Sequence, residues 1–310
     1  MAADKLENVN AGQYDLVKKA TGDHFSSLWW DNFLKNQELI VKNRGVGVLG
    51  DHGNFLGVKS ILVGAGPSLD KVLPYLFQIQ SQCLIIACDA AMKPLQAAGV
   101  NPHIVVTLDP QKIIADFFVG VQSSRTLLIA PTIIHPEVLR VWKGKVLFFN
   151  KNAPDYQVLI DVCNHARHIP QLTPGGSVLS VGYDLAFRLG CDPLVFIGQD
   201  LSFHAEKTHA KASNHGKNNT EQVLLKTSHK VKNIDIFGKE VTTVMSLSTS
   251  KEWFQWMFKA NRQHRDTVTI NATEAGIIRE NCKILSFRES MTMAGKKQVN
   301  VERELRKILS

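Results

Sequence analysis

The sequence has no apolar run that is long enough to cross a membrane. Hydrophobic residues make up 44% of the 310 positions, but no run of them approaches the roughly 18 residues that a membrane-spanning helix needs. The first eight residues are polar and lack the apolar core of a signal peptide. We therefore expect a protein without a membrane span that stays in the cytoplasm.

Cysteine is scarce and widely spaced. The five cysteines form no Cys-x-x-Cys pair, and an odd number does not suit a disulfide framework. His204, His209 and His215 lack the spacing of zinc ligands. The net charge is +8, but its lysines form no repeated basic-aromatic pattern, so nucleic acid is not an expected partner.

Two common phosphate-binding signatures are also missing. The loop Gly64–Ser68 is not followed by the Gly-Lys-Ser/Thr of a Walker loop, and it lacks the third glycine of the dinucleotide fingerprint. No Asp-x-Asp pair occurs, so a compact metal–diphosphate site of that kind is not indicated. These absences exclude the familiar nucleotide-binding motifs but not nucleotide binding itself.

Short apolar runs alternate with helical stretches from about residue 59 onward. Each run is nearly continuous, which is typical of strands that are buried on both faces of a parallel sheet covered by helices. We therefore predict an α/β protein with a Rossmann-like, doubly wound, mostly parallel sheet. The predicted strands are 61–63, 84–87, 104–107, 127–130, 146–149, 194–197 and 268–270.

The sheet is expected to carry additions at both ends and one long insertion. Residues 1–57 are predicted to form a helical extension, 58–290 the nucleotide-binding domain, and 291–310 a C-terminal helix. Within the domain, 204–240 lack periodicity and are interpreted as a lid-like, partly mobile insertion. Thr249 and Glu252 have the spacing of a capping box, which predicts a helix start there.

Polar residues collect where the predicted strands end, and ligands of open parallel sheets bind at that edge. Glycines allow close backbone approach, and a helix N-terminus offers free N–H groups to an anion. The candidate nucleotide-binding residues are Gly64, Ala65, Gly66, Pro67, Ser68, Asp89, Asp109, Thr173, Gly175, Gly176, Ser177, Gln199 and Asp200.

Each of these features has a purely structural alternative. Gly64–Ser68 also suits a tight strand-to-helix turn without ligand, and Ser177 suits a helix cap after a turn. Asp89 suits a helix cap better than a ligand-binding role. A histidine of the insertion suits either a general base or an exposed loop residue.

The motifs, taken in order, resemble one protein family. They are Gly64-Ala-Gly-Pro-Ser-Leu-Asp70, Ala87-Cys-Asp89, Leu95-x-x-x-Gly99-Val-x-Pro102, Leu108-Asp-Pro-Gln111, Gly175-Gly-Ser-Val178, Gly198-Gln-Asp-Leu-Ser202 and Ile270-Asn-Ala-Thr-Glu-Ala-Gly276. This set resembles the family that holds the motility-associated Maf glycosyltransferases and the archaeal 6-hydroxymethylpterin diphosphokinase MptE. Bacterial lipooligosaccharide sialyltransferases are more remotely similar.

The resemblance implies a glycosyltransferase-like enzyme that uses a nucleotide-activated, CMP-linked sugar in surface-glycan or flagellar modification. It implies that the Gly64–Ser68 loop holds the CMP portion, that the Thr173–Ser177 turn faces the phosphate or sugar carboxylate, and that His209 is the catalytic base. The acceptor would be a glycan or a protein, and no cofactor would be required.

Two alternatives remain from the same resemblance. The first is ATP pyrophosphoryl transfer to a pterin alcohol, in which Mg²⁺ would be held by Asp89, Asp109 and Asp200. The second is a non-catalytic nucleotide-binding protein.

Overall fold

A nine-stranded parallel sheet forms the centre of the protein. The computed structural model describes residues 11–50, 53–203, 205–227 and 229–309, so the first ten residues of the expected extension and His204 lie outside it. The strand order is β11-β10-β7-β1-β2-β3-β4-β5-β6, and each registered pair in this sheet is parallel. The strands are β1 (Ser60–Val63), β2 (Leu84–Cys88), β3 (Ile104–Val106), β4 (Leu127–Pro131), β5 (Val146–Lys151), β6 (Gln171–Leu172), β7 (Leu194–Ile197), β10 (Thr269–Asn271) and β11 (Lys283–Ile284).

The predicted α/β fold class is therefore confirmed, and all seven predicted strands are present. Each central strand is buried along its whole length, as in β1 and β7, because helices cover both faces of the sheet. Two strands of this sheet were not predicted: β6 and β11 have two residues each, which is too short for a run of apolar residues to reveal them.

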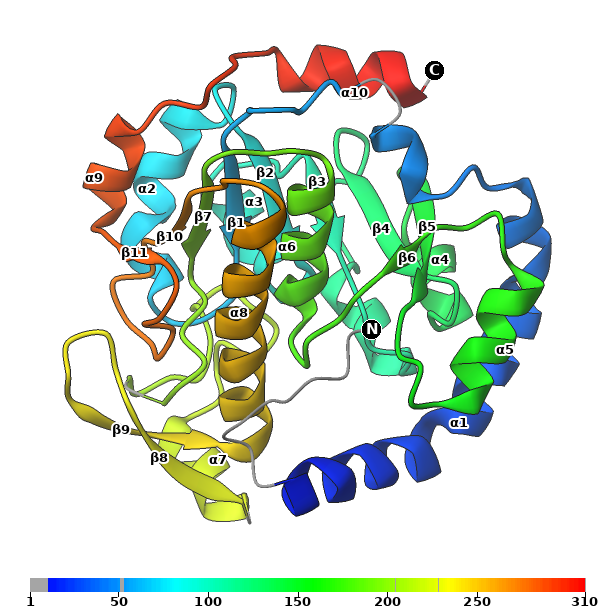
Figure 1. Ribbon diagram of the computed structural model, residues 1–310, viewed down its shortest axis with the longest axis horizontal. Helices are drawn as coiled ribbons and strands as arrows, with labels where there is room; N and C mark the ends of the chain where they lie inside the picture. Colours follow the sequence, from blue (N-terminus) through cyan, green and yellow to red (C-terminus); the bar gives the residue numbers. More distant parts are fainter. Residues whose placement is uncertain (1–10, 51–52, 204, 228, 310) are drawn as a thin grey trace.

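Helices of two groups cover the two faces (Figure 1). Alternate strand residues such as Leu62 and Ile86 join one apolar cluster with α6, α8 and α10. Their neighbours, such as Ile61 and Val105, join two clusters on the other face with α1, α2, α3, α4, α5 and α9. The helices are α1 (Ala11–Lys42), α2 (Leu69–Ile79), α3 (Met92–Ala97), α4 (Pro136–Val141), α5 (Gln157–His165), α6 (Val178–Arg188), α7 (Thr220–Lys226), α8 (Met245–His264), α9 (Phe287–Thr292) and α10 (Val301–Leu309).

The N-terminal extension is a long helix that packs on the sheet. Trp29, Phe33 and Ile40 of α1 are buried against strand residues such as Phe148. Asn32 Nδ2 donates hydrogen bonds of 2.9 and 3.0 Å to the carbonyl oxygens of Pro110 and Ile133. Because these carbonyls follow β3 and β4, α1 fixes the loops at the carboxyl ends of both strands.

The insertion 204–240 is more regular than its sequence predicted. It contains α7 and, with the residues that follow, an antiparallel hairpin of β8 (Lys230–Ile234) and β9 (Glu240–Val244). The hairpin was missed because its residues are mostly polar, and a two-stranded ribbon buries little apolar surface to mark its pattern.

The predicted helix start at Thr249 is wrong. Thr249 lies one turn inside α8, and its hydroxyl donates a 3.0 Å hydrogen bond to the Met245 carbonyl oxygen. A capping box does occur at the start of a different helix, α9, where Ser286 and Glu289 form it. Among the described residues, no helix combines the length and the apolar character that a membrane crossing needs.

Candidate functional site

The strand order reverses between β1 and β7, and the predicted loops meet there. From β1 the chain proceeds strand by strand to β6, and α6 then returns it to β7 on the other side of β1. The Gly64–Ser68 loop and the Gly198–Asp200 turn are therefore neighbours at the carboxyl edge. In open α/β sheets this reversal is the place where ligands bind.

Asp200 closes the first of these loops from within the protein. Its carboxylate accepts a hydrogen bond of 3.1 Å from the Ser68 backbone N–H and a second from the Ser68 hydroxyl. A Cβ placed on Gly66 would lie 2.5 Å from the carboxyl carbon of Asp200, and one on Gly64 would lie 2.7 Å from Gln199 Oε1. The absence of side chains at these two glycines therefore allows the turn that follows β7 to pack closely against the loop.

The expected open N-terminus of α2 is consequently wrong. Ser68 is bound to Asp200, and the N–H groups of Leu69, Asp70 and Lys71 donate to carbonyl oxygens of residues 66–68. The Ser68 side chain makes no capping bond to the helix, because its hydroxyl is directed to Asp200 instead. The carboxylate of Asp200 thus occupies the position where a phosphate was expected.

The second predicted loop, Thr173–Ser177, has a different construction. Trp253 and Ser250 of α8 pack directly against it, so that a Cβ on Gly175 would overlap the Trp253 indole ring. Gly176 has a φ of +87°, a conformation that favours glycine. Gly175 N–H donates a 2.7 Å hydrogen bond to the Ser180 hydroxyl.

The N-terminus of α6, which follows this loop, stays open. Ser177 makes no side-chain cap, and its hydroxyl accepts a 3.2 Å hydrogen bond from Gln199 Nε2. Within the described residues, the N–H groups of Ser177, Val178 and Leu179 have no hydrogen-bond acceptor, whereas the Ser180 N–H donates to the Ser177 carbonyl oxygen. Gln199 therefore joins this open helix end to the closed Gly64–Ser68 loop.

Two aspartates follow β2 and β3. Asp89 is buried, and it accepts 2.8 Å hydrogen bonds from the Thr107 hydroxyl and the Ala90 N–H. Burial raises the pKa of Asp89 to about 6, and the negative charge of Asp109 adds to the rise. Asp109 accepts a 2.8 Å hydrogen bond from the Gln111 N–H.

These two aspartates do not form a cluster with Asp200. In the described part of the chain, no three Asp, Glu, His or Cys side chains are grouped so that they could hold a metal ion. Asp200 follows β7, which lies two strand positions from β2 and three from β3, and its carboxylate is bound to Ser68.

The predicted base, His209, lies in a part of the insertion that is fixed to the first loop. The Ala210 N–H donates a 2.9 Å hydrogen bond to the Ala65 carbonyl oxygen, and the Lys211 N–H donates to Asp70. His209 Nδ1 lies 2.9 Å from the Thr208 hydroxyl, and its ring contacts that of His215 with 5.1 Å between centroids. His209 therefore lies beside the Gly64–Ser68 loop.

The imidazole of His209 is neutral at pH 7. Burial and the neighbouring His215 lower the pKa of His209 to about 4. The His215 ring in turn contacts Phe117, with 5.2 Å between centroids, in the segment that follows β3. A neutral imidazole can accept a proton from an acceptor hydroxyl, although a pKa of about 4 makes it a weaker base than an ordinary histidine.

A comparison with known families identifies the chain. Residues 31–206, more than half of the sequence, match the family described as 6-hydroxymethylpterin diphosphokinase MptE-like. The chain belongs to this MptE-like family. The resemblance that the sequence motifs indicated is thereby confirmed.

Two further comparisons concern single proteins. An uncharacterized protein of Treponema pallidum (strain Nichols) is 28% identical over 156 residues, which are 49% of this chain and 27% of that protein. The Maf glycosyltransferase of Magnetospirillum magneticum AMB-1 has a similar structure, with a TM-score of 0.61 at 18% identity. This match covers 90% of the MptE-like chain but 42% of the Maf protein, so it shows a shared fold.

Sequence reasoning missed Lys151, a cation at the same edge. Lys151 ends β5, and its ammonium lies 4.8 Å from the centre of the Trp29 ring. Burial lowers the pKa of Lys151 to about 8, against the opposing effect of Asp109. Its position two residues after the predicted strand 146–149 was the available signal, and Asn150 lies between them. Asn150 is a structural residue whose amide donates to the carbonyl oxygens of Ala166 and Ile169.

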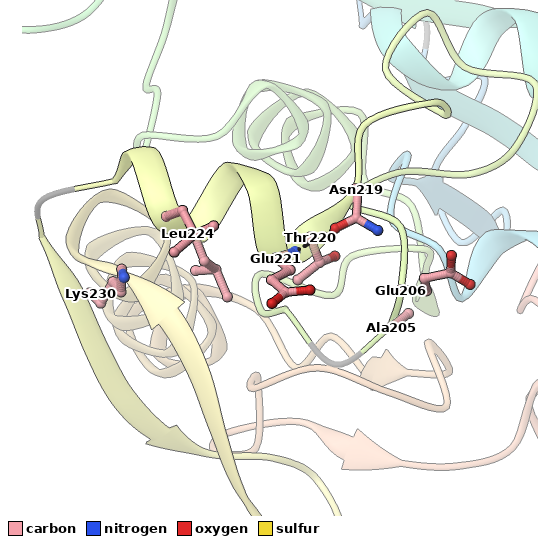
Figure 2. A pocket seen from close by; sticks show the side chains of 8 residues that line it. Ala205, Glu206, Asn219, Thr220, Glu221, Leu224 and Lys230 are labelled. Carbon is pink, nitrogen blue, oxygen red and sulfur yellow. Dashed lines mark hydrogen bonds between the residues drawn. The ribbon is translucent and has the colours of Figure 1, made fainter.

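A hollow of about 390 Å³ lies elsewhere, within the insertion (Figure 2). It is lined by Ala205, Glu206, Asn219, Thr220, Glu221, Leu224, Leu225 and Lys230. None of the predicted nucleotide-binding residues lines it, and its walls are mainly apolar. We therefore place the candidate site at the carboxyl edge of the sheet, where the polar groups converge.

Proposed function

We propose that this MptE-like protein is a glycosyltransferase-like enzyme that uses a nucleotide-activated sugar, with CMP as the carrier. The observation that carries the proposal is the meeting of three elements at the strand-order reversal. These are the Gly64–Ser68 loop, the open N-terminus of α6 and the segment that holds His209.

Each element has a chemical role in this proposal. The open N–H groups of Ser177, Val178 and Leu179 bind the phosphate, which the positive end of α6 stabilises. The loop closed by Asp200 forms the wall against which the nucleoside packs. Ala65, whose carbonyl is bound to Ala210, links this wall to the His209 segment.

The reaction is a displacement at the anomeric carbon of the sugar. The acceptor oxygen forms the new bond, the bond from carbon to the phosphate oxygen breaks, and the nucleotide leaves as its monophosphate. His209 takes the proton of the acceptor hydroxyl, and the α6 N-terminus stabilises the charge on the leaving phosphate. The acceptor is a hydroxyl of a glycan or a protein.

The family name supports a second candidate, transfer of pyrophosphate from ATP to a pterin alcohol. In that case Mg²⁺ would neutralise the triphosphate, with Asp89 and Asp109, which are close enough for the charge of one to raise the pKa of the other, as its carboxylates.

Thermal unfolding with CMP, CDP, UDP, GDP, AMP and ATP, each with EDTA or with Mg²⁺, separates the two candidates. We expect CMP and CDP to raise the unfolding temperature in EDTA, because backbone N–H groups rather than a cation bind their phosphate. Stabilisation by ATP alone, and only with Mg²⁺, would refute the glycosyltransferase proposal and favour its rival.

A further inference from the structure

The ammonium of Lys151 has no anionic partner, although it lies inside the fold. Lys151 pairs in register with Leu172 of β6, and its side chain is half-buried over the Trp29 ring. Among the described residues, its Nζ makes no hydrogen bond and no ion pair. Asp109 is near enough to influence its protonation, but the two side chains are not in contact as an ion pair. The positive charge of this ammonium is therefore not neutralised by a described residue, and an anionic ligand could neutralise it.

Two buried polar atoms of α1 beside this position are also unpaired. Trp29, which carries the ammonium on its ring face, has an Nε1–H without a hydrogen-bond acceptor in the described structure. One turn along the helix, Asn32 Oδ1 likewise accepts no hydrogen bond from a described residue. Both side chains are almost completely buried, and buried polar atoms of native proteins normally have a partner. Such atoms point to a small polar ligand or ordered water between α1 and the strand ends.

Lys151 is connected to the candidate site but separated from its centre. Its neighbour Asn152 donates a 3.1 Å hydrogen bond to the Thr173 hydroxyl, where the loop that leads to α6 begins. In the sheet, β5 lies four positions from β1, which corresponds to about 19 Å at the usual strand spacing. A group bound at Lys151 therefore lies on the same edge as the nucleotide, at the far end from the Gly64–Ser68 loop.

We propose that Lys151 forms a separate anion subsite, which binds a carboxylate or phosphate group of the second substrate over the face of Trp29. A lysine is suited to this role because it binds either group as a point charge, without a fixed geometry. The assignment of this anion to the second substrate rests on the proposed function, whereas the binding of an anion by Lys151 does not depend on it.

Site-resolved lysine labelling tests the subsite directly. The full chain is treated with an N-hydroxysuccinimide ester, and acetylation at each lysine is followed by mass spectrometry at constant ionic strength. Inorganic phosphate or acetate should slow acetylation of Lys151 about fivefold at four times the dissociation constant, since only unoccupied sites react. Lys145, an exposed lysine immediately before β5, is the matched control and should react at an unchanged rate.

Three results would overturn the inference: no protection by either anion, equal protection by sodium chloride, or equal protection of Lys145. Protection of Lys151 by phosphate should persist when CMP is saturating, and its loss would show that the subsite belongs to the nucleotide. In a second measurement, Lys151→Met should remove the phosphate-dependent rise in unfolding temperature that remains with CMP present, whereas Lys145→Met should keep it. If CMP does not bind at all, the proposed function fails, while the labelling without CMP still decides this inference.

Discussion

Two loops of the candidate site share a sequence pattern and differ in structure. Both have glycines after a strand and a serine before a helix, at Gly64–Ser68 and at Gly175–Ser177. In the first, Asp200 from the turn after the neighbouring strand β7 binds Ser68 and neutralises the start of α2. In the second, Gln199 Nε2 donates to the Ser177 hydroxyl and accepts nothing from the helix N–H groups, so the start of α6 stays open.

The difference shows that a glycine-rich turn before a helix does not by itself define an anion site. The positive end of a helix stabilises any negative group that reaches it, whether that group belongs to a ligand or to the protein. Adjacent residues on one turn after β7 thus close one helix end and leave the other available. In both loops the glycines allow another part of the protein to pack closely against the backbone. The packing atoms belong to Asp200 in the first loop and to Trp253 in the second.

The largest expected effect concerns the chemistry beside the closed loop. His209→Ala should lower turnover by roughly 10²–10⁴-fold and leave nucleotide binding unchanged, because only the proton acceptor is lost. Turnover with a CMP-sugar and calorimetric nucleotide affinity are the two measurements. His264→Ala, an exposed histidine at the end of α8, is the control. Normal turnover of the His209 variant would remove this residue from the mechanism.

The next largest expected effect is a loss of stability when the packing of α8 on the Thr173–Ser177 loop is disturbed. Gly175→Ala should lower the free energy of unfolding by about 3 kcal/mol, since the added methyl group would overlap the Trp253 ring. Gly50→Ala is the matched control because its Cβ would make only ordinary contacts, and it should change stability by less than about 0.5 kcal/mol. Urea unfolding of both variants checks this, and equal stabilities would contradict the close packing of α8 on the loop.

The closed loop can be opened by a single substitution. Asp200→Ala should cost about 2 kcal/mol of unfolding free energy, because it leaves the buried Ser68 N–H and hydroxyl without their acceptor. The same variant should gain more stability from added sulfate than the wild type, since the α2 N-terminus becomes free for an anion. Asp200→Asn retains an acceptor oxygen and should lose less. An Ala variant that responds to sulfate like the wild type would show that Asp200 does not block this end.

The smallest effect lies at Asp89, on the strand next to the closed loop. The pKa of this carboxyl rises from 3.8 to about 6 on folding, so the folded state binds more protons than the unfolded state between these values. Stability should therefore fall as the pH rises from about 4 to about 6. Asp89→Asn should remove this fall and be more stable at pH 7, on the order of 1 kcal/mol, because the amide carries no charge to bury.

Unfolding free energies at pH 4, 5, 6 and 7 for both proteins check this expectation. The Thr107 hydroxyl can accept a hydrogen bond from the Asn amide, so that the local contact is kept. The same slope in both proteins between pH 4 and 6 would assign the pH dependence to another group.

The sequence by itself determined the sheet and the edge at which its polar residues gather. Continuous apolar runs such as 84–87 specify buried parallel strands, because each residue faces a helix on one side or the other. The residues after those runs then necessarily lie at one edge. The hairpin β8–β9 and the short strands β6 and β11 escaped prediction, since they bury too little apolar surface to leave a pattern.

Only the tertiary structure decided what each polar group binds. Asp200 and Ser68 are 132 positions apart, and their hydrogen bonds depend on β7 returning to lie beside β1. In the same way, Lys151 and Trp29 are brought together by the packing of α1 on the sheet. The local sequence pattern predicts the conformation of a segment. The partner of a charged group depends instead on which strands and helices pack side by side in the tertiary structure. For that reason the sequence could locate the candidate site, but it could not distinguish its closed helix end from its open one.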